Sequence, residues 1–93
     1  MFDMSRATPA GVVTRFSVLA DPDPGTMARV LELFAKRGLT PRRFSGQIGD
    51  TPEPKLELEI EACGLAQDLE AHMARSMAQI FGVEAVSHAR LGT

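Results

Sequence analysis

The sequence lacks several residue types, and each absence excludes a class of protein. Its 93 residues include no tryptophan, no tyrosine and one cysteine, Cys63. A single cysteine cannot form a disulfide within the chain, which suits a reducing cytoplasm. No stretch approaches the ~20 apolar residues of a membrane span, and residues 1–11 lack the apolar run of a signal peptide. We therefore expect one soluble, cytoplasmic domain, because the length is enough for one domain and too short for two.

The sequence also offers little for catalysis, metal binding or nucleic-acid binding. Cys63 and the two histidines, His72 and His88, fall on different predicted elements, so no nucleophile has a base beside it. His72 has no second ligand one helical turn on, since position 76 is serine. The net charge of −2 gives no bulk attraction for nucleic acid or an anionic membrane. We predict a protein that is not an enzyme and needs no metal or cofactor.

Hydrophobic periodicity predicts six elements. Apolar residues at every second position predict strands, most clearly where Leu56, Leu58 and Ile60 alternate with glutamates. Apolar residues three and four apart predict two amphipathic helices. The apolar stripe of the first is Met27, Val30, Leu31 and Phe34, and that of the second is Leu69, Met73, Met77 and Ile80. The expected strands are residues 12–20, 42–48, 55–62 and 83–91, and the expected helices are 26–37 and 66–81.

The order of these elements is βαββαβ, which predicts a ferredoxin-like α+β fold. Right-handed crossovers place both helices on one face of a four-stranded antiparallel sheet. The other face would carry Glu57, Glu59 and Glu61 with Arg15 and Arg43, and would lie in water. RNA-binding modules of similar topology stack bases on aromatic residues at this face, whereas glutamates repel phosphate. We expect residues 1–11 to form a flexible tail and residues 12–93 a single domain.

The turn before the first helix, Asp-Pro-Asp-Pro-Gly, is the candidate functional feature. A helix N-terminus presents free N–H groups and suits a carboxylate, and glycine allows a ligand or a neighbouring backbone to approach closely. The alternative is a purely structural turn with Asp23 or Thr26 as the N-cap. The candidate effector-binding or dimer-interface residues are Asp21, Asp23, Pro24, Gly25, Thr26 and Met27.

Three segments resemble the start of an ACT domain: residues 23–27 (Asp-Pro-Gly-Thr-Met), 29–30 (Arg-Val) and 33–39 (Leu-Phe-Ala-Lys-Arg-Gly-Leu). More closely, they are similar to the small regulatory subunit of acetolactate (acetohydroxyacid) synthase. Residues 26–31, the core of the first helix, look most like the short, single-domain members. The resemblance covers roughly residues 12 to 91. Many members carry Asn or Asp at the position of Pro22, where it contacts the ligand. Proline offers no such contact, so the turn is expected first as an interface and second as a ligand site.

The resemblance implies a function carried out with partners. It implies a homodimer formed through sheet edges or the first helix, with amino-acid effectors bound near the turn. It also implies that the chain activates or tunes a thiamine-diphosphate-dependent catalytic subunit in branched-chain amino acid biosynthesis, or makes it sensitive to valine-type effectors. Two alternatives stay open: a free-standing ACT-type amino-acid sensor, and a dimeric interaction module with another partner.

Overall fold

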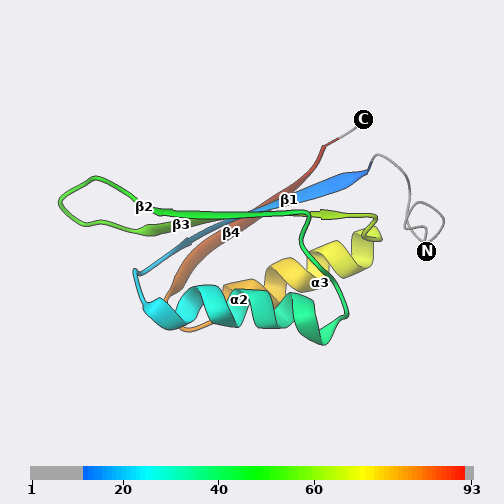
Figure 1. Cartoon of the computed structure of the whole chain (residues 1–93), viewed down its shortest axis with the longest axis horizontal. Coiled ribbons are helices and arrows are strands. Elements are labelled where there is room, and N and C mark those ends of the chain that lie inside the picture. Colours follow the sequence, from blue (N-terminus) through cyan, green and yellow to red (C-terminus); the bar gives the residue numbers. More distant parts are fainter. Residues whose placement is uncertain (1–11, 92–93) are drawn as a thin grey trace.

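A computed structural model describes residues 12–91, so the expected tail of residues 1–11 lies outside the described residues. Figure 1 shows two layers, a sheet and a pair of helices that cover one of its faces. The strands are β1 (Val13–Ala20), β2 (Arg43–Ile48), β3 (Leu56–Cys63) and β4 (Val83–Leu91). The helices are α2 (Pro24–Lys36) and α3 (Gln67–Ala78).

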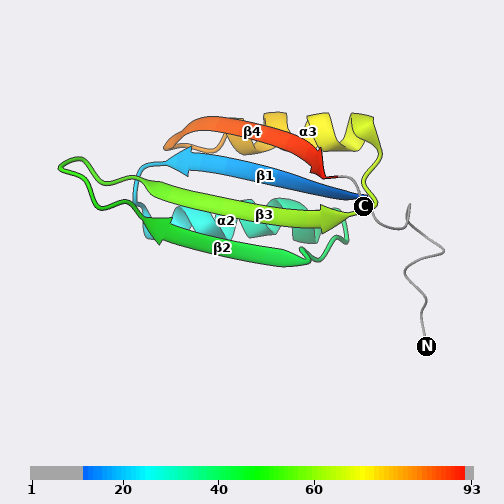
Figure 2. The same cartoon turned by 90° about the horizontal axis from the view of Figure 1, so that it is seen from above.

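The sheet order is β2-β3-β1-β4, and every neighbouring pair is antiparallel, as Figure 2 shows from above. This confirms the ferredoxin-like βαββαβ fold. Each strand lies within one residue of its predicted range. In the same view α2 lies behind β2 and β3, and α3 lies behind β4. The two edge strands are therefore β2 and β4.

The core lies between the sheet and the helices. Phe16 on β1 and Phe34 on α2 meet edge to face, with ring centroids 5.9 Å apart and ring planes at 79°. This arrangement of two aromatic rings is favourable beyond the area that they bury. The alternating apolar residues of β3 face the same layer. The remaining buried members of the cluster are Val18, Ala20, Val30, Leu56, Leu58, Ile60, Ala62, Leu65, Met73 and Met77.

Helix α2 differs from its prediction at its start and in its buried face. It begins at Pro24, because a proline at the first helical position has no N–H to lose. Its buried residues are Thr26, Val30 and Phe34. Met27 and Leu31 are 39% and 38% exposed, so the expectation that both belong to the buried stripe was wrong. In Figure 2 the helix lies behind β2 and β3, the edge strand and its neighbour.

Helix α3 ends at Ala78, three residues before the predicted end at Phe81. The Gln79 and Ile80 N–H groups bond to carbonyls three residues back, which tightens the chain into a turn. Gly82 then adopts φ +92°, a conformation that glycine tolerates, and leads into β4. Phe81 is left 87% exposed. Within residues 12–91 no helix is long and apolar enough to cross a membrane.

The sheet face away from the helices is charged, as expected, but its charged side chains are not all exposed to solvent. Glu57 and Glu59 are exposed, whereas Glu61 is 3% exposed. Its carboxylate lies 3.1 Å from Arg15 Nη2 and 3.5 Å from Arg42 Nε. The prediction that all three glutamates are solvated was therefore wrong at Glu61, because two arginines cover and neutralise it.

Candidate functional site

The turn between β1 and α2 is built by its own side chains. Asp23 is the N-cap, and its Oδ1 accepts a 2.8 Å hydrogen bond from the Gly25 N–H. The Thr26 N–H bonds to the Asp23 carbonyl at 3.0 Å. Of the two N-caps left open by the sequence, Asp23 is the one used. Its negative charge is thereby turned toward the helix start, where the dipole favours it.

The other aspartate of the turn is engaged by a distant lysine. Asp21 Oδ1 lies 3.0 Å from Lys55 Nζ, which also contacts the carboxylate of Glu84. Hydrogen bonds to Glu84 and Asp21 raise the pKa of Lys55 to about 12. The Asp21 N–H in turn donates to the Gly82 carbonyl at 2.8 Å. The turn is therefore fastened to the β2–β3 loop and to the α3–β4 connection.

The guanidinium of Arg29 packs against the first turn of α2. A Cβ placed on Gly25 would be 2.9 Å from Arg29 Nη1, so the guanidinium packs where a side chain would otherwise stand. Within residues 12–91 no carboxylate oxygen lies within 4.0 Å of the Arg29 guanidinium nitrogens. The guanidinium and the helix N-terminus add their positive potentials at one place. This arrangement suits a carboxylate or another small anion.

The last two predicted site residues face different surroundings. Thr26 is fully buried, and its Oγ1 has no hydrogen-bond partner among the described residues. Met27 points toward the sheet edge, where its Sδ lies 3.4 Å from the position of a Cβ on Gly46. The six predicted residues therefore lie close together, between residues 21 and 27, but their side chains do not share one set of surroundings. Met27 belongs to the edge.

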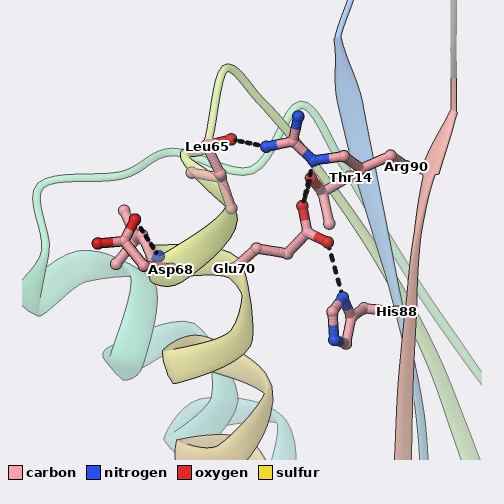
Figure 3. Close-up of polar contacts among 7 residues, drawn as sticks. Thr14, Leu65, Asp68, Glu70, His88 and Arg90 are labelled. Carbon is pink, nitrogen blue, oxygen red and sulfur yellow. Dashed lines mark hydrogen bonds and ion pairs between the residues drawn. The ribbon is translucent and has the colours of Figure 1, made fainter.

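A second polar cluster joins α3 to the sheet (Figure 3). Glu70 accepts a 2.7 Å hydrogen bond from the Thr14 hydroxyl and lies 2.9 Å from Arg90 Nε and 2.7 Å from His88 Nδ1. Burial alone would raise the pKa of Glu70, but the hydrogen bonds from Thr14, Arg90 and His88 outweigh it, and the pKa lies below its ordinary value. Arg90 also donates to the Leu65 carbonyl.

This second cluster is structural in its chemistry. The Glu70 side chain is 6% exposed and its carboxylate already contacts Thr14, His88 and Arg90, so little of it is open to a substrate. Cys63 is exposed at the end of β3. Within residues 12–91 no three His, Cys, Asp or Glu side chains are grouped as a metal site would need.

Two residues of the β1–α2 site were missed by sequence reasoning. Arg29 stands four residues after Gly25, and i, i+4 neighbours share a helix face, so this contact had a local signal. Lys55 had none, because 34 residues separate it from Asp21. Only the pairing of β1 with β3, which sets Ala20 opposite Leu56, brings those two segments together.

Comparisons with known proteins agree with this architecture. A family model described as an ACT-like domain matches residues 7–92. Among solved structures, the chain is similar to the ACT domain from GTP pyrophosphokinase of Chlorobium tepidum, with 9% identity, a TM-score of 0.67, and coverage of 83% of this chain and 96% of that one. It is also similar to the C-terminal domain of the MgtC protein from Mycobacterium tuberculosis, with 14% identity, a TM-score of 0.67 and coverage of 89% and 92%.

The regulatory subunit of aspartate kinase from Thermus flavus is a further structural neighbour, with 14% identity, a TM-score of 0.56, and coverage of 90% of this chain and 63% of that one. At these identities the likeness concerns the fold alone. No curated protein matches the chain in sequence.

Proposed function

Because this chain belongs to the ACT-like domain family, we propose that it is a non-catalytic regulatory subunit whose β1–α2 turn binds the carboxylate of an amino acid. ACT domains are typically regulatory modules that bind amino acids and commonly dimerise. In this proposal the chain tunes a separate catalytic subunit in the cytoplasm. The candidate for that subunit is acetolactate synthase, in branched-chain amino acid biosynthesis, on the resemblance of residues 26–39 to its small subunit.

The observation that carries the ligand site is the Arg29 guanidinium on Gly25. Two aspartates flank the turn and would repel a carboxylate if their charges were free. Asp21 forms an ion pair with Lys55, and the carboxylate of Asp23 accepts a hydrogen bond from the Gly25 N–H. The positive charge of Arg29 is therefore the one that faces an incoming anion. Arg29 can supply the polar contact that Pro22 cannot. We therefore favour a ligand-binding role for this turn over a role as a dimer interface.

The interface is better supplied by the β2 edge. Phe44, Gly46 and Ile48 alternate on the helix side of β2, since they pair with core-facing residues of β3. Ile48 is 53% exposed, Met27 and Leu31 of α2 are also exposed, and Met27 Sδ lies 3.4 Å from the position of a Cβ on Gly46. An antiparallel pairing of two β2 strands about a two-fold axis at Gly46 would set Phe44 opposite Ile48 of the second copy. Both apolar pairs would then lie on the same side, and the two sheets would join into one.

The ligand proposal is tested by thermal shift and calorimetry with the common amino acids and their carboxamides. A bound ligand at 100 times its dissociation constant stabilises the fold by about 2.7 kcal/mol. We expect a shift with at least one amino acid and none with its carboxamide, which lacks the carboxylate. A flat screen at millimolar concentrations, or equal binding of both forms, would remove the ligand site.

The partner proposal is tested separately, by mixing the protein with the acetolactate synthase catalytic subunit and measuring acetolactate formation with and without the effector. Binding together with a changed rate supports the regulatory subunit. Amino-acid binding without any effect on the synthase would instead favour the free-standing sensor. That sensor is the second candidate, because the Arg29 site is built within one chain.

A further inference from the structure

The sheet face opposite the helices is hollowed and open. In Figure 2 no helix or loop of the described chain crosses it. The hollow has a volume of about 530 Å³ and reaches all four strands. This volume lies within the range of about 300–1,000 Å³ found for binding pockets. The side chains that line it from this face are Ser17, Leu19, Ser45, Gln47, Glu57, Glu59, Ala85 and Ser87.

The strand register arranges these side chains in two rows. One row crosses the sheet as Ser45, Glu59, Ser17 and Ser87. The next row is Gln47, Glu57, Leu19 and Ala85. Small side chains, Ser17 on β1 and Ala85 and Ser87 on β4, line this part of the hollow and leave space above the strands. The two glutamates rise from β3 beside it.

The hollow is acidic. Its lining holds two carboxylates and no lysine or arginine, a formal charge of −2. Glu57 accepts a hydrogen bond only from a neutral group, Gln47 Nε2 at 3.3 Å, among the described residues. Glu59 lies 3.9 Å from Arg15 Nε, but that guanidinium is committed to Glu61 at 3.1 Å. The charges of the two lining carboxylates are therefore largely uncompensated by the contacts above and can attract a cationic partner.

We propose that this hollow sheet face docks a convex, positively charged protein segment, in the simplest case a helix that presents two lysines or arginines to Glu57 and Glu59. A helix is about 10–12 Å across, and four strands spaced by about 4.8 Å span about 14 Å between the outer strands, which is wide enough to seat it. The serine hydroxyls can accept further hydrogen bonds from ammonium or guanidinium groups. The match is one of charge and of shape.

Other occupants fit the face less well. A second copy would bring hollow against hollow, enclose a void and bury four carboxylates. Nucleic acid would bring phosphate against Glu57 and Glu59. Pairing of two copies through the β2 edge leaves this face open, so both contacts can exist together. The identity of the partner as the regulated catalytic subunit rests on the proposed function, whereas the docking surface itself does not.

The test uses the full ¹⁵N-labelled chain and three alanine-based helical peptides that differ on one face. That face carries lysine, glutamate or glutamine at i, i+4 and i+7. We expect the lysine peptide alone to shift the amides of Ser17, Ser45 and Ala85, with binding weakened by added salt. The double variant Glu57→Gln/Glu59→Gln should bind roughly tenfold more weakly, from the loss of two surface charge pairs. Glu53→Gln, in the exposed β2–β3 loop, is the matched control.

Equal binding of the glutamate peptide, shifts confined to other surfaces, or full binding by the double variant with an unchanged melting temperature would each overturn the proposal. The same variants are then mixed with the synthase catalytic chain. Loss of that complex in the double variant alone assigns the face to the enzyme. If both variants bind the synthase catalytic chain as well as the native chain does, that assignment is overturned. Failure of the native chain to bind the synthase overturns the regulatory partner, while the peptide result decides the docking surface by itself.

Discussion

The carboxylate of Glu70 on α3 accepts a 2.7 Å hydrogen bond from the hydroxyl of Thr14 on the central strand β1. Both residues are buried, with exposures of 5% and 0%. The same carboxylate contacts His88 and Arg90 on β4. One charged group thus links the second helix to a central strand and to an edge strand, where apolar contacts are fewer.

Replacement of Glu70 by glutamine should destabilise the fold by about 1.5–3 kcal/mol, the usual worth of a hydrogen bond to a charged group. The amide keeps the shape but loses the charge that holds Arg90 and His88. Urea denaturation at neutral pH measures the effect, with Glu53→Gln in an exposed loop as control. A loss no larger than that of the control would show that the cluster contributes nothing net.

The same group should make stability depend on acid. The pKa of Glu70 is lowered in the folded chain: burial opposes this, but hydrogen bonds from Thr14, Arg90 and His88 prevail. A lowered folded pKa gives stability that is present above the unfolded pKa, about 4.3, and is lost as pH falls through the folded pKa. The gap in unfolding free energy between the native chain and Glu70→Gln should therefore narrow below about pH 4.3. A gap that stays constant on acidification contradicts this origin.

Gly25→Ala should separate ligand binding from folding. The new Cβ would lie 2.9 Å from Arg29 Nη1, the end of a flexible side chain that can move away at little cost. The melting temperature should stay near that of the native chain, while affinity for an amino acid falls roughly tenfold or more as the guanidinium is displaced. Arg29→Ala should match it in calorimetry, and Arg29→Lys should recover part of the binding. Unchanged affinity in both Gly25→Ala and Arg29→Ala would place the ligand elsewhere.

Ile48→Glu should disrupt the proposed dimer. The side chain is 53% exposed in the single chain, so the change costs the monomer little. In the edge-to-edge dimer the carboxylate would be buried opposite Phe44 without a partner. Sedimentation equilibrium should show a monomer at concentrations where the native chain dimerises. The control is Phe81→Glu, at an exposed position away from the β2 edge, and a dimer lost equally in both would argue against this edge.

Gly46→Ala should show how closely β2 fits its neighbour. A Cβ there would stand 2.7 Å from Leu58 Cδ2, and Leu58 is 1% exposed, so it has no room to retreat. Overpacking of this kind costs about 1–3 kcal/mol. Leu58→Val removes Cδ2, so the double variant should lose less than the sum of the two single variants. Strict additivity would show that the two positions do not compete for space.

The fold could be predicted from the sequence because its signals are local. The Leu–Glu alternation of β3 and the Pro-Gly start of α2 depend on neighbours a few residues away. The burial of Met27 could not be predicted, because helical spacing says which residues share a face but not how far the sheet extends above them. Met27 lies at the sheet edge, beside Gly46, and stays partly in water.

The sequence also could not predict contacts between charged residues that lie far apart along the chain. The burial of Glu61 depends on Arg15 and Arg42, which reach it from separate segments of the chain. Glu70 lies outside the apolar stripe of α3 but is buried, because Thr14, His88 and Arg90 on the sheet contact its carboxylate. Neither pairing has a spacing that sequence alone could show. The six candidate residues of the β1–α2 turn could be proposed from the sequence because they lie close together, between residues 21 and 27, and their role stays a prediction.

The ammonium of Lys55 is shared by the β1–α2 turn, through Asp21, and by the start of β4, through Glu84. With its pKa raised to about 12, Lys55 stays charged at any pH that a cell meets. Its two contacts to carboxylates nevertheless depend on the salt concentration. The three side chains are 31%, 59% and 44% exposed, so dissolved ions screen them. Added salt should therefore loosen the contacts that fasten the β1–α2 turn to the β2–β3 loop and to the start of β4.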